Sequence, residues 1–321
     1  MFSPLMREEV LTGDGSFSHK QHGLAALSTA GTVAIAGPDS FPFAVRLVTY
    51  SSDRGPRAGV ARDGGVIDAW DSLGEGDRSS LRELIAEGRQ ADLEGAQGDP
   101  VAGARLLPPI PDPEKIICIG LNYRSHAAEA GIDPPESPTF FGKFRNALAA
   151  PSSTVTLPGA SEKVDYEAEL AFVIRSRASG VAAEDALDNV AGYTLLNDLS
   201  ARDLQFATPQ WMPGKVFDGS APSGPWLVTP DEAGPHDGLS FSLDLNGETM
   251  QSASTDDLIF SVPELVAHLS RLMTLEPGDI IATGTPSGVG SVRDPRVWLE
   301  DGDEVVISSP TLGRLETRIA R

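Results

Sequence analysis

The chain has 321 residues, of which 40% are hydrophobic and 22% are charged, a composition typical of a soluble globular protein with one large or two ordinary domains. Its formal net charge of -21 argues against nucleic acid or an anionic membrane surface as a partner. The single cysteine, Cys118, excludes an intramolecular disulfide and fits a cytoplasmic location.

The amino-terminal part predicts an extension followed by a small domain. Residues 1–43 mix glycine, serine, alanine and threonine with little periodicity, so we expect a poorly ordered extension. They carry no pattern of a secretion signal, and no run in the chain reaches the about 18 apolar residues that span a membrane. Residues 44–92 predict a small α+β domain with a strand, a hairpin and a helix over 44–50, 57–69 and 80–87.

The remaining chain predicts a linker and one larger domain. Residues 93–113 are rich in proline, which favours an extended linker. Residues 114–321 carry many strand patterns and few helical ones, which predicts a mostly antiparallel β domain. Its clearest elements are a hairpin across Asn246-Gly247 and a helix over residues 261–272.

A short helix after the first strand of this domain carries a histidine and a glutamate. Ser125 is expected to cap it and Gly131 to end it. His126 and Glu129 are then three residues apart on one face, where the carboxylate can fix the tautomer of the imidazole and raise its basicity. The alternative is an ordinary pair of surface residues.

The strand pattern over residues 164–174 contains two glutamates. Glu167 and Glu169 project from the same face, about 6.6 Å apart along the backbone. Asp198, at the end of a second apolar run, can supply a third carboxylate. Three carboxylates without clustered cysteine or histidine favour Mg²⁺, Mn²⁺ or Ca²⁺ over Zn²⁺. The alternative is the solvated face of a half-buried sheet.

Five motifs, in this order along the chain, together resemble the fumarylacetoacetate hydrolase family over about residues 115–309. They are Gly120-Leu121-Asn122-Tyr123-x-x-His126-Ala127-x-Glu129, Asp165-Tyr166-Glu167-x-Glu169-Leu170, Asn197-Asp198-x-x-Ala201-Arg202-Asp203-x-Gln205, Gly214-Lys215-x-Phe217-Asp218 and Gly278-Asp279-x-Ile281-x-Thr283-Gly284-Thr285-Pro286-x-Gly288-Val289-Gly290. Residues 44–92 also look like the amino-terminal domain of many bacterial members.

The resemblance implies an α+β, mostly β fold, a mixed β-sandwich roll with the small amino-terminal α+β domain, assembled as a homodimer. It implies a catalytic domain over residues 114–321 in which Mg²⁺ or Mn²⁺ is held by Glu167, Glu169 and Asp198. Catalysis would use His126, Glu129 and Lys215. His126 and Glu129 would form a catalytic dyad on a lid helix. The expected contacts to a small anionic oxo acid are Tyr123, Arg124, Arg202, Gln205 and Thr285.

The implied reaction is the metal-dependent hydrolysis of a carbon–carbon bond in an acylpyruvate or fumarylpyruvate from aromatic catabolism. The same constellation would also suit a 2-hydroxyhepta-2,4-diene-1,7-dioate isomerase or an oxaloacetate-type decarboxylase, because all three reactions pass through an enolate. A catalytically silent, ligand-binding dimer is a further alternative, since fold does not fix function.

Overall fold

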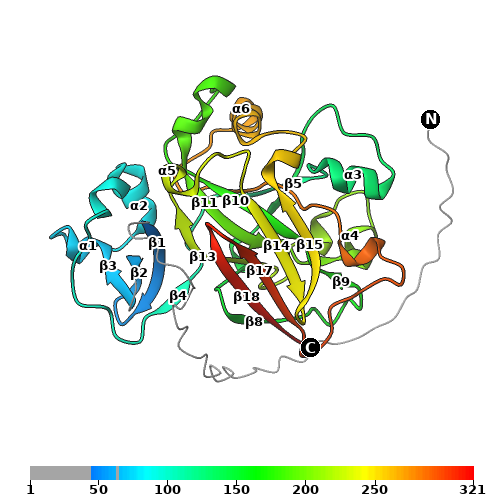
Figure 1. The fold of residues 1–321 in the computed structure, drawn as a ribbon, viewed down its shortest axis with the longest axis horizontal. Coiled ribbons are helices and arrows are strands. Elements are labelled where there is room, and N and C mark those ends of the chain that lie inside the picture. Colours follow the sequence, from blue (N-terminus) through cyan, green and yellow to red (C-terminus); the bar gives the residue numbers. More distant parts are fainter. Residues whose placement is uncertain (1–44, 63–64) are drawn as a thin grey trace, which may run out of the picture. The chain divides into compact units, whose positions relative to one another are not determined.

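The computed structural model describes residues 45–62 and 65–321 (Figure 1). The extension predicted for residues 1–43 therefore lies outside the described residues. Within the described ranges, no helix is long and apolar enough to cross a membrane. The fold is mostly β, as predicted, with a large mixed sheet and a smaller second sheet.

The predicted strand, hairpin and helix of the amino-terminal part are present as β1 (Arg46–Ser52), the pair β2 (Gly55–Arg62) and β3 (Gly65–Asp68), and α2 (Leu81–Ala86). A short helix that was not predicted, α1 (Ala69–Ser72), follows β3. β1 pairs antiparallel with β2, and β2 with β3. Strand β4 (Arg105–Leu107), inside the predicted linker, pairs with β1. The domain boundaries themselves stay a prediction.

The large sheet runs in the order β3-β2-β1-β13-β11-β10-β16-β5-β6, with β4 beside β1 and β7 beside β13. Its other strands are β5 (Ile116–Gly120), β6 (Thr139–Lys143), β7 (Leu148–Ala149), β10 (Ala168–Ile174), β11 (Val190–Asn197), β13 (Ala221–Val228) and β16 (Ile280–Ala282). Pairings within it are antiparallel except β16 with β5 and β7 with β13. β6 is the last strand of the order and therefore lies at an edge of the sheet.

The second sheet runs in the order β15-β14-β17-β18-β8. Its strands are β8 (Ser153–Thr156), β14 (Ser240–Leu245), β15 (Glu248–Ser254), β17 (Glu304–Ser309) and β18 (Gly313–Ala320). A separate short pair consists of β9 (Val164–Asp165) and β12 (Ser200–Ala201). β14 and β15 form the predicted hairpin, whose Asn246 and Gly247 both have positive φ, as such a two-residue turn requires.

The remaining helices are α3 (Arg124–Ala130), α4 (Arg202–Gln205), α5 (Pro230–Ala233) and α6 (Val262–Leu272). Short 3₁₀ helices cover Arg89–Leu93, Arg145–Ala147, Ala183–Asn189, Met212–Gly214, Thr255–Asp257 and Gly290–Val292. The predicted helix over residues 261–272 is confirmed as α6, which begins after Ser261 with a capping box to Glu264.

The main core lies between the two sheets and against α6 (Figure 1). β10 is buried along its whole length because alternate residues serve two cores. Phe172 packs with Leu243, Leu315 and Val266 in the core between the sheets. Its neighbour Val173 belongs to a second cluster on the opposite face of the large sheet.

A buried ion pair stabilises the amino-terminal hairpin. Asp68 accepts hydrogen bonds from Arg57 Nε at 2.5 Å and Nη2 at 2.9 Å, and from the hydroxyl of Tyr50 at 2.5 Å. Burial would raise the pKa of Asp68, but the hydrogen bonds from Arg57 and Tyr50 outweigh it and hold the pKa below its ordinary value. The charged carboxylate therefore contributes stability to the folded state.

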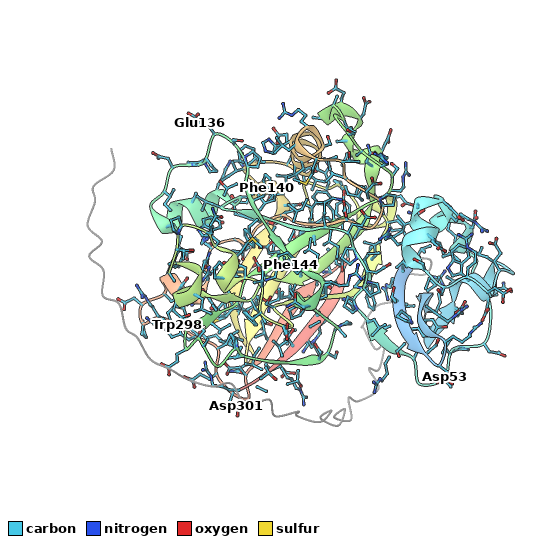
Figure 2. The ribbon with its side chains drawn as sticks, turned by 180° about the vertical axis from the view of Figure 1, so that it is seen from behind. Asp53, Glu136, Phe140, Phe144, Trp298 and Asp301 are labelled. Carbon is cyan, nitrogen blue, oxygen red and sulfur yellow. The ribbon has the colours of Figure 1, made fainter. Side chains whose placement is uncertain are left out.

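We predict that Asp68→Asn lowers the free energy of unfolding by about 3 kcal/mol, because it leaves the buried guanidinium of Arg57 without its counterion. Urea denaturation at pH 7 measures it. The control is Asp53→Asn, at an exposed site between β1 and β2 (Figure 2), with an expected change within about 0.5 kcal/mol. The stability from Asp68 is lost as pH falls below about 4, so the two variants should converge there.

Candidate active site and metal centre

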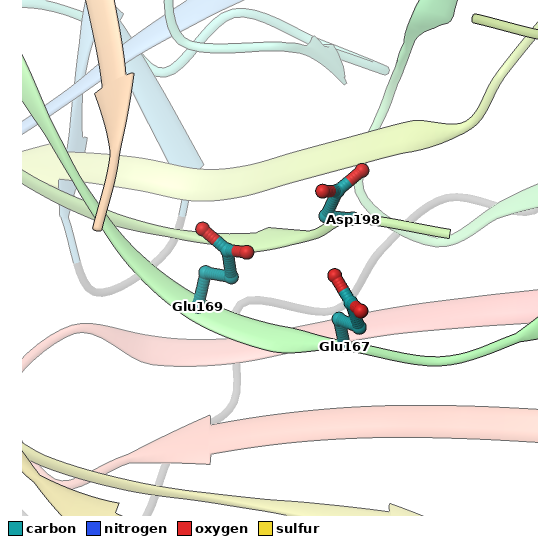
Figure 3. A group of neighbouring side chains, drawn as sticks. All are labelled: Glu167, Glu169 and Asp198. Carbon is teal, nitrogen blue, oxygen red and sulfur yellow. The ribbon is translucent and has the colours of Figure 1, made fainter. Parts of the chain in front are cut away.

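Three carboxylates predicted to bind a metal meet at one end of β10 and β11. One oxygen from each of Glu167, Glu169 and Asp198 lies within 4.8 Å of the others (Figure 3). The pairing of Ala168 with Asn197 brings Asp198, just past β11, opposite Glu167. Only 6%, 1% and 1% of these residues is exposed, so the alternative of a solvated sheet face is wrong.

The strand predicted over residues 164–174 is not continuous. β9 ends at Asp165 and β10 begins at Ala168, so Glu167 lies between two strands. The N–H of Glu167 donates to Asn197 Oδ1 at 3.1 Å, and that of Ala168 to Gln251 Oε1 at 2.9 Å. These side-chain amides satisfy two backbone N–H groups at the break between the strands.

Glu167 is surrounded by positive charge. Lys215 Nζ lies 2.7 Å from its Oε2, and Arg202 Nη2 lies 2.7 Å from its Oε1. Burial would raise the pKa of Glu167, but Arg202 and Lys215 more than offset it and lower the pKa to about 2. Lys215 Nζ also donates to Asp198 Oδ2 at 2.7 Å, so the predicted catalytic lysine bridges two predicted metal ligands.

Glu169 is in the opposite electrostatic situation. Its Oε2 accepts a hydrogen bond from the N–H of Gly284 at 2.8 Å, and within the described residues it forms no ion pair. Burial, followed by the charges of Asp198 and Glu167, raises the pKa of Glu169 well above its ordinary value. A bound cation would remove this repulsion.

The residues present fit a divalent metal. Three buried carboxylates that converge within one ion's reach offer only oxygen ligands, as hard cations prefer. Within the described residues, Glu169 is the one carboxylate of the three without an ion pair, and burial together with the charges of Asp198 and Glu167 raises its pKa. Glu167, Glu169 and Asp198 would therefore hold the ion, and its identity among Mg²⁺, Mn²⁺ and Ca²⁺ stays a prediction.

Two charged residues at the site were not among the predicted site residues. Lys143, at the end of β6, places Nζ 2.6 Å from Asp198 Oδ1 with a fully buried side chain. Its signal was a single lysine inside a run of apolar strand residues. Asp165 is also buried, and it accepts hydrogen bonds from the N–H groups of Gly290 and Ser291 at 2.7 and 3.0 Å. Asp165 thus connects the glycine-rich loop, residues 284–290, to the predicted metal ligands.

Several predicted substrate contacts have partners within the protein. Arg202 donates through Nε and Nη2 to Asp165 Oδ2, at 2.9 and 2.8 Å, and through Nη1 to Gln205 Oε1 at 3.0 Å. The hydroxyl of Thr285 donates to the carbonyl of Ala168 at 2.9 Å. In this arrangement Arg202 holds the carboxylates in place, and the contacts of Arg202, Gln205 and Thr285 with substrate stay predictions.

The predicted dyad is formed on α3. His126 Nδ1 lies 3.2 Å from Glu129 Oε2, and the other carboxylate oxygen of Glu129 accepts the N–H of Gly288 at 2.9 Å. The side chains of His126 and Glu129 are only 17% and 26% exposed. His126 also contributes to the lowered pKa of Glu167, which places the dyad within electrostatic reach of the carboxylates.

The start of α3 differs from the prediction. The helix begins at Arg124, and Ser125 is not its cap; the N–H of Ser125 instead donates to Asp257 Oδ2 at 3.0 Å. The predicted end at Gly131 is confirmed. The substrate-contact candidates Tyr123 and Arg124 lie here: Tyr123 is buried edge-on against Phe241, and Arg124 donates to the carbonyl of Leu258. Their contact with substrate stays a prediction.

Three comparisons place the chain among known proteins. The profile of the family described as fumarylacetoacetate (FAA) hydrolase C-terminal matches residues 115–320. A mitochondrial oxaloacetate tautomerase of Xenopus laevis is 38% identical over 288 residues, covering 86% of this chain and 90% of the relative. Two solved structures each cover 86% of this chain. A 5-carboxymethyl-2-hydroxymuconate delta-isomerase from Mycobacterium smegmatis has a TM-score of 0.69 at 33% identity, with 98% of its chain covered. A maleylpyruvate hydrolase from Sphingobium has a TM-score of 0.69 at 31% identity, with 99% of its chain covered.

We predict that Glu169→Gln weakens the binding of Mn²⁺ by more than the about 10- to 100-fold expected for an outer partner of a metal ligand, because it removes a ligand and its charge. The metal-free variant should melt no lower than the parent, since the carboxylate it loses is the one whose pKa is raised by burial. Titration calorimetry and thermal melts measure both, with exposed Glu162→Gln as control. Unchanged Mn²⁺ affinity would contradict the metal assignment.

Proposed function

The chain belongs to the fumarylacetoacetate hydrolase family, and we propose that it is a divalent-metal-dependent tautomerase of 2-oxo dicarboxylic acids of the oxaloacetate type. The observation that carries the proposal is the His126–Glu129 pair beside a buried cluster of three carboxylates. This is the minimum needed to move one proton on a carbon next to a carbonyl group.

The metal would supply Lewis-acid polarisation of the 2-oxo group when bound to Glu167, Glu169 and Asp198. Glu129 would accept a hydrogen bond from the N–H at Nδ1 of His126 and so leave Nε2 as the basic ring nitrogen. His126 Nε2 would take a proton from carbon 3 of the keto acid, and the oxygen of the resulting enolate would gain a proton from a water molecule. The imidazolium would return its proton to the hydroxide so formed, which restores neutral His126 and water. The return to the keto form reverses these transfers.

Lys215 would stabilise the negative charge that develops on the oxo group. Its ammonium is buried, and it lies 2.7 Å from both Glu167 and Asp198. Burial would lower the pKa of Lys215, but the charges of Asp198 and Glu167 outweigh it and keep the pKa above its ordinary value. Lys215 therefore stays charged throughout the physiological pH range and acts as an electrostatic group, not as a base.

Proton transfer is favoured over hydrolysis by the relatives. The names of two of them, the oxaloacetate tautomerase and the muconate isomerase, describe the same class of reaction. Hydrolysis of an acylpyruvate, the reaction implied by the sequence, is kept as the second candidate because of the similarity to maleylpyruvate hydrolase. Hydrolysis additionally needs a water molecule placed for attack on the carbonyl, which the tautomerase does not require.

The proposal is tested with purified protein, Mg²⁺ or Mn²⁺ and a panel of three substrates, each repeated with EDTA. We expect EDTA-sensitive ketonisation of enol-oxaloacetate, followed by its ultraviolet absorbance, without release of pyruvate. EDTA-sensitive pyruvate from acetylpyruvate or maleylpyruvate, without ketonisation, would overturn the tautomerase and favour the hydrolase. Release of CO₂ and pyruvate from oxaloacetate would favour a decarboxylase.

We predict that His126→Ala lowers the rate of the metal-dependent reaction by about 10²- to 10⁴-fold, because it removes the group that carries the proton. Mn²⁺ affinity should stay within about twofold of the parent, since His126 is not a ligand. The matched control is His268→Ala, on α6 outside the site, which should keep full activity. A His126→Ala variant with most of its rate would exclude the dyad from catalysis.

The wider expectations from the sequence remain part of the proposal. We retain a homodimer as the assembly and a small anionic oxo acid as the partner, in keeping with the family. The cytoplasmic location stays a prediction, and the relative from Xenopus laevis is named as mitochondrial. Oligomeric state is measured by light scattering on the purified chain.

A further inference from the structure

We propose that Lys143 is a positioning residue that sets the net charge of the metal centre, so that it weakens the binding of the divalent cation and strengthens that of the anionic oxo acid. This inference rests on the proposed function, because it concerns the metal and the substrate of the same site. It assigns a role to a residue that the sequence motifs leave out.

Lys143 is built into the site by the edge strand of the large sheet. It is the last residue of β6, opposite Ile116 of β5, and its side chain has no exposed surface. Within the described residues its one ion pair is the contact of 2.6 Å with Asp198 Oδ1. Its neighbours Phe140 and Phe144 are 37% and 56% exposed, so the strand buries the lysine and leaves the aromatic rings at the surface (Figure 2).

Burying an ammonium group on an edge strand is costly unless the charge has a use. Structural needs do not explain it, because an apolar side chain would fill the end of a strand at lower cost. Within the described residues, the one hydrogen bond and the one ion pair of its Nζ go to Asp198. Its charge therefore acts most directly on one predicted metal ligand.

Asp198 divides its two oxygens between two ammonium groups. Oδ1 faces Lys143 and Oδ2 faces Lys215, at 2.6 and 2.7 Å. Lys215 additionally contacts Glu167 and lies 5.0 Å from the ring centroid of Phe141, so it touches several parts of the site. Among the described residues, the ammonium group of Lys143 forms an ion pair only with Asp198. Removing Lys143 therefore changes the charge of the site with little change to its other contacts.

The charges of the cluster give this change a definite sign. Among the described residues, four buried carboxylates, Asp165, Glu167, Glu169 and Asp198, face three buried cations, Lys143, Arg202 and Lys215. The protein side of the site thus has one negative charge in excess when all these groups are charged. A bound divalent ion would make the site positive by one charge, which attracts an anionic substrate in spite of the protein's overall negative charge.

Without Lys143, the protein side would have two negative charges in excess. A divalent ion would then be attracted more strongly, and the loaded site would be neutral toward the substrate. Because all these charges are buried, screening by water is weak, and one unit of charge is worth about tenfold or more in affinity. The two affinities must move in opposite directions.

A merely structural role predicts a different result. If Lys143 only kept Asp198 in its rotamer, its loss would let the carboxylate move. The binding of the metal and the binding of the substrate would then both become weaker. Opposite shifts therefore identify the electrostatic role, and parallel losses identify the structural one.

The experiment measures both affinities on the full chain. Mn²⁺ is titrated into metal-free protein, with free Mn²⁺ detected by electron paramagnetic resonance. Oxalate, a planar dianion that resembles the enolate of a 2-oxo acid, is then titrated by calorimetry at saturating Mn²⁺. For Lys143→Met we expect Mn²⁺ to bind about tenfold more tightly and oxalate about tenfold more weakly than in the parent.

Two further variants separate charge from shape and folding. Lys143→Gln keeps a hydrogen-bond donor and removes only the charge, so it should shift both affinities as Lys143→Met does, and it replaces Lys143→Met if that variant melts before the parent's working temperature. Lys115→Met is the matched control, because Lys115 also forms an ion pair with a buried carboxylate, Asp279 at 2.8 Å, but outside the site. It should leave both affinities within about twofold of the parent.

Weaker or unchanged Mn²⁺ binding in folded Lys143→Met and Lys143→Gln would overturn the inference, as would a parent that binds no Mn²⁺. The outcome is independent of the reaction. Opposite shifts in a protein without tautomerase activity would uphold the role of Lys143 and reject the proposed function. Tautomerase activity together with parallel losses of both affinities would uphold the proposed function and reject the role of Lys143.

Discussion

The site depends on one physical constraint, the cost of burying four carboxylates in a single cluster. Each carboxylate leaves water on folding and repels its neighbours, so each needs compensation from a cation or from backbone N–H groups. Asp165 receives both, Glu167 receives two cations, and Asp198 receives two ammonium groups. Glu169 receives a single N–H, from Gly284. Among the described residues, Glu169 is the one carboxylate of the four without an ion pair, and this is why the cluster could hold a divalent metal.

The constraint explains why the compensating groups come from distant parts of the chain. The carboxylates lie where β10 and β11 leave the sheet, and Lys143 arrives on the edge strand β6. Gly284 must approach closely: it has a φ of 96°, and a Cβ there would lie 3.0 Å from the carbonyl oxygen of Ile119. A side chain would push the loop away and take the N–H from Glu169. The rigid sheets fix the acids, and the loops complete the site around them.

Local patterns in the sequence predict most of this architecture, and the failures share one cause. The turn at Asn246-Gly247, α6 and the pair on α3 depend on residues close together in the sequence, which is why they could be predicted. The break before β10 depends on Gln251, 83 residues away, and the capping of α3 on Asp257, 132 residues away. Lys143 likewise becomes meaningful only when β6 is placed beside Asp198. The sequence showed a lysine inside an apolar strand, but it did not show that this lysine would contact Asp198.

We infer that the predicted lid helix, α3, decides which reaction such a site performs. All the candidate reactions need the same stabilised enolate, so the carboxylates and Lys215 cannot distinguish them. Water can. Glu129 joins the lid to the glycine-rich loop by accepting the N–H of Gly288, while its other oxygen holds His126. Gly288 has no room for a side chain, since a Cβ would lie 2.1 Å from the carbonyl oxygen of Met250, so this contact is fixed by the loop. One carboxylate therefore contacts both the predicted base, His126, and the loop at Gly288. A proton can be moved with the lid closed, whereas hydrolysis needs a water molecule enclosed with the substrate, and we infer that the difference between tautomerase and hydrolase lies in the space beneath α3 rather than at the metal.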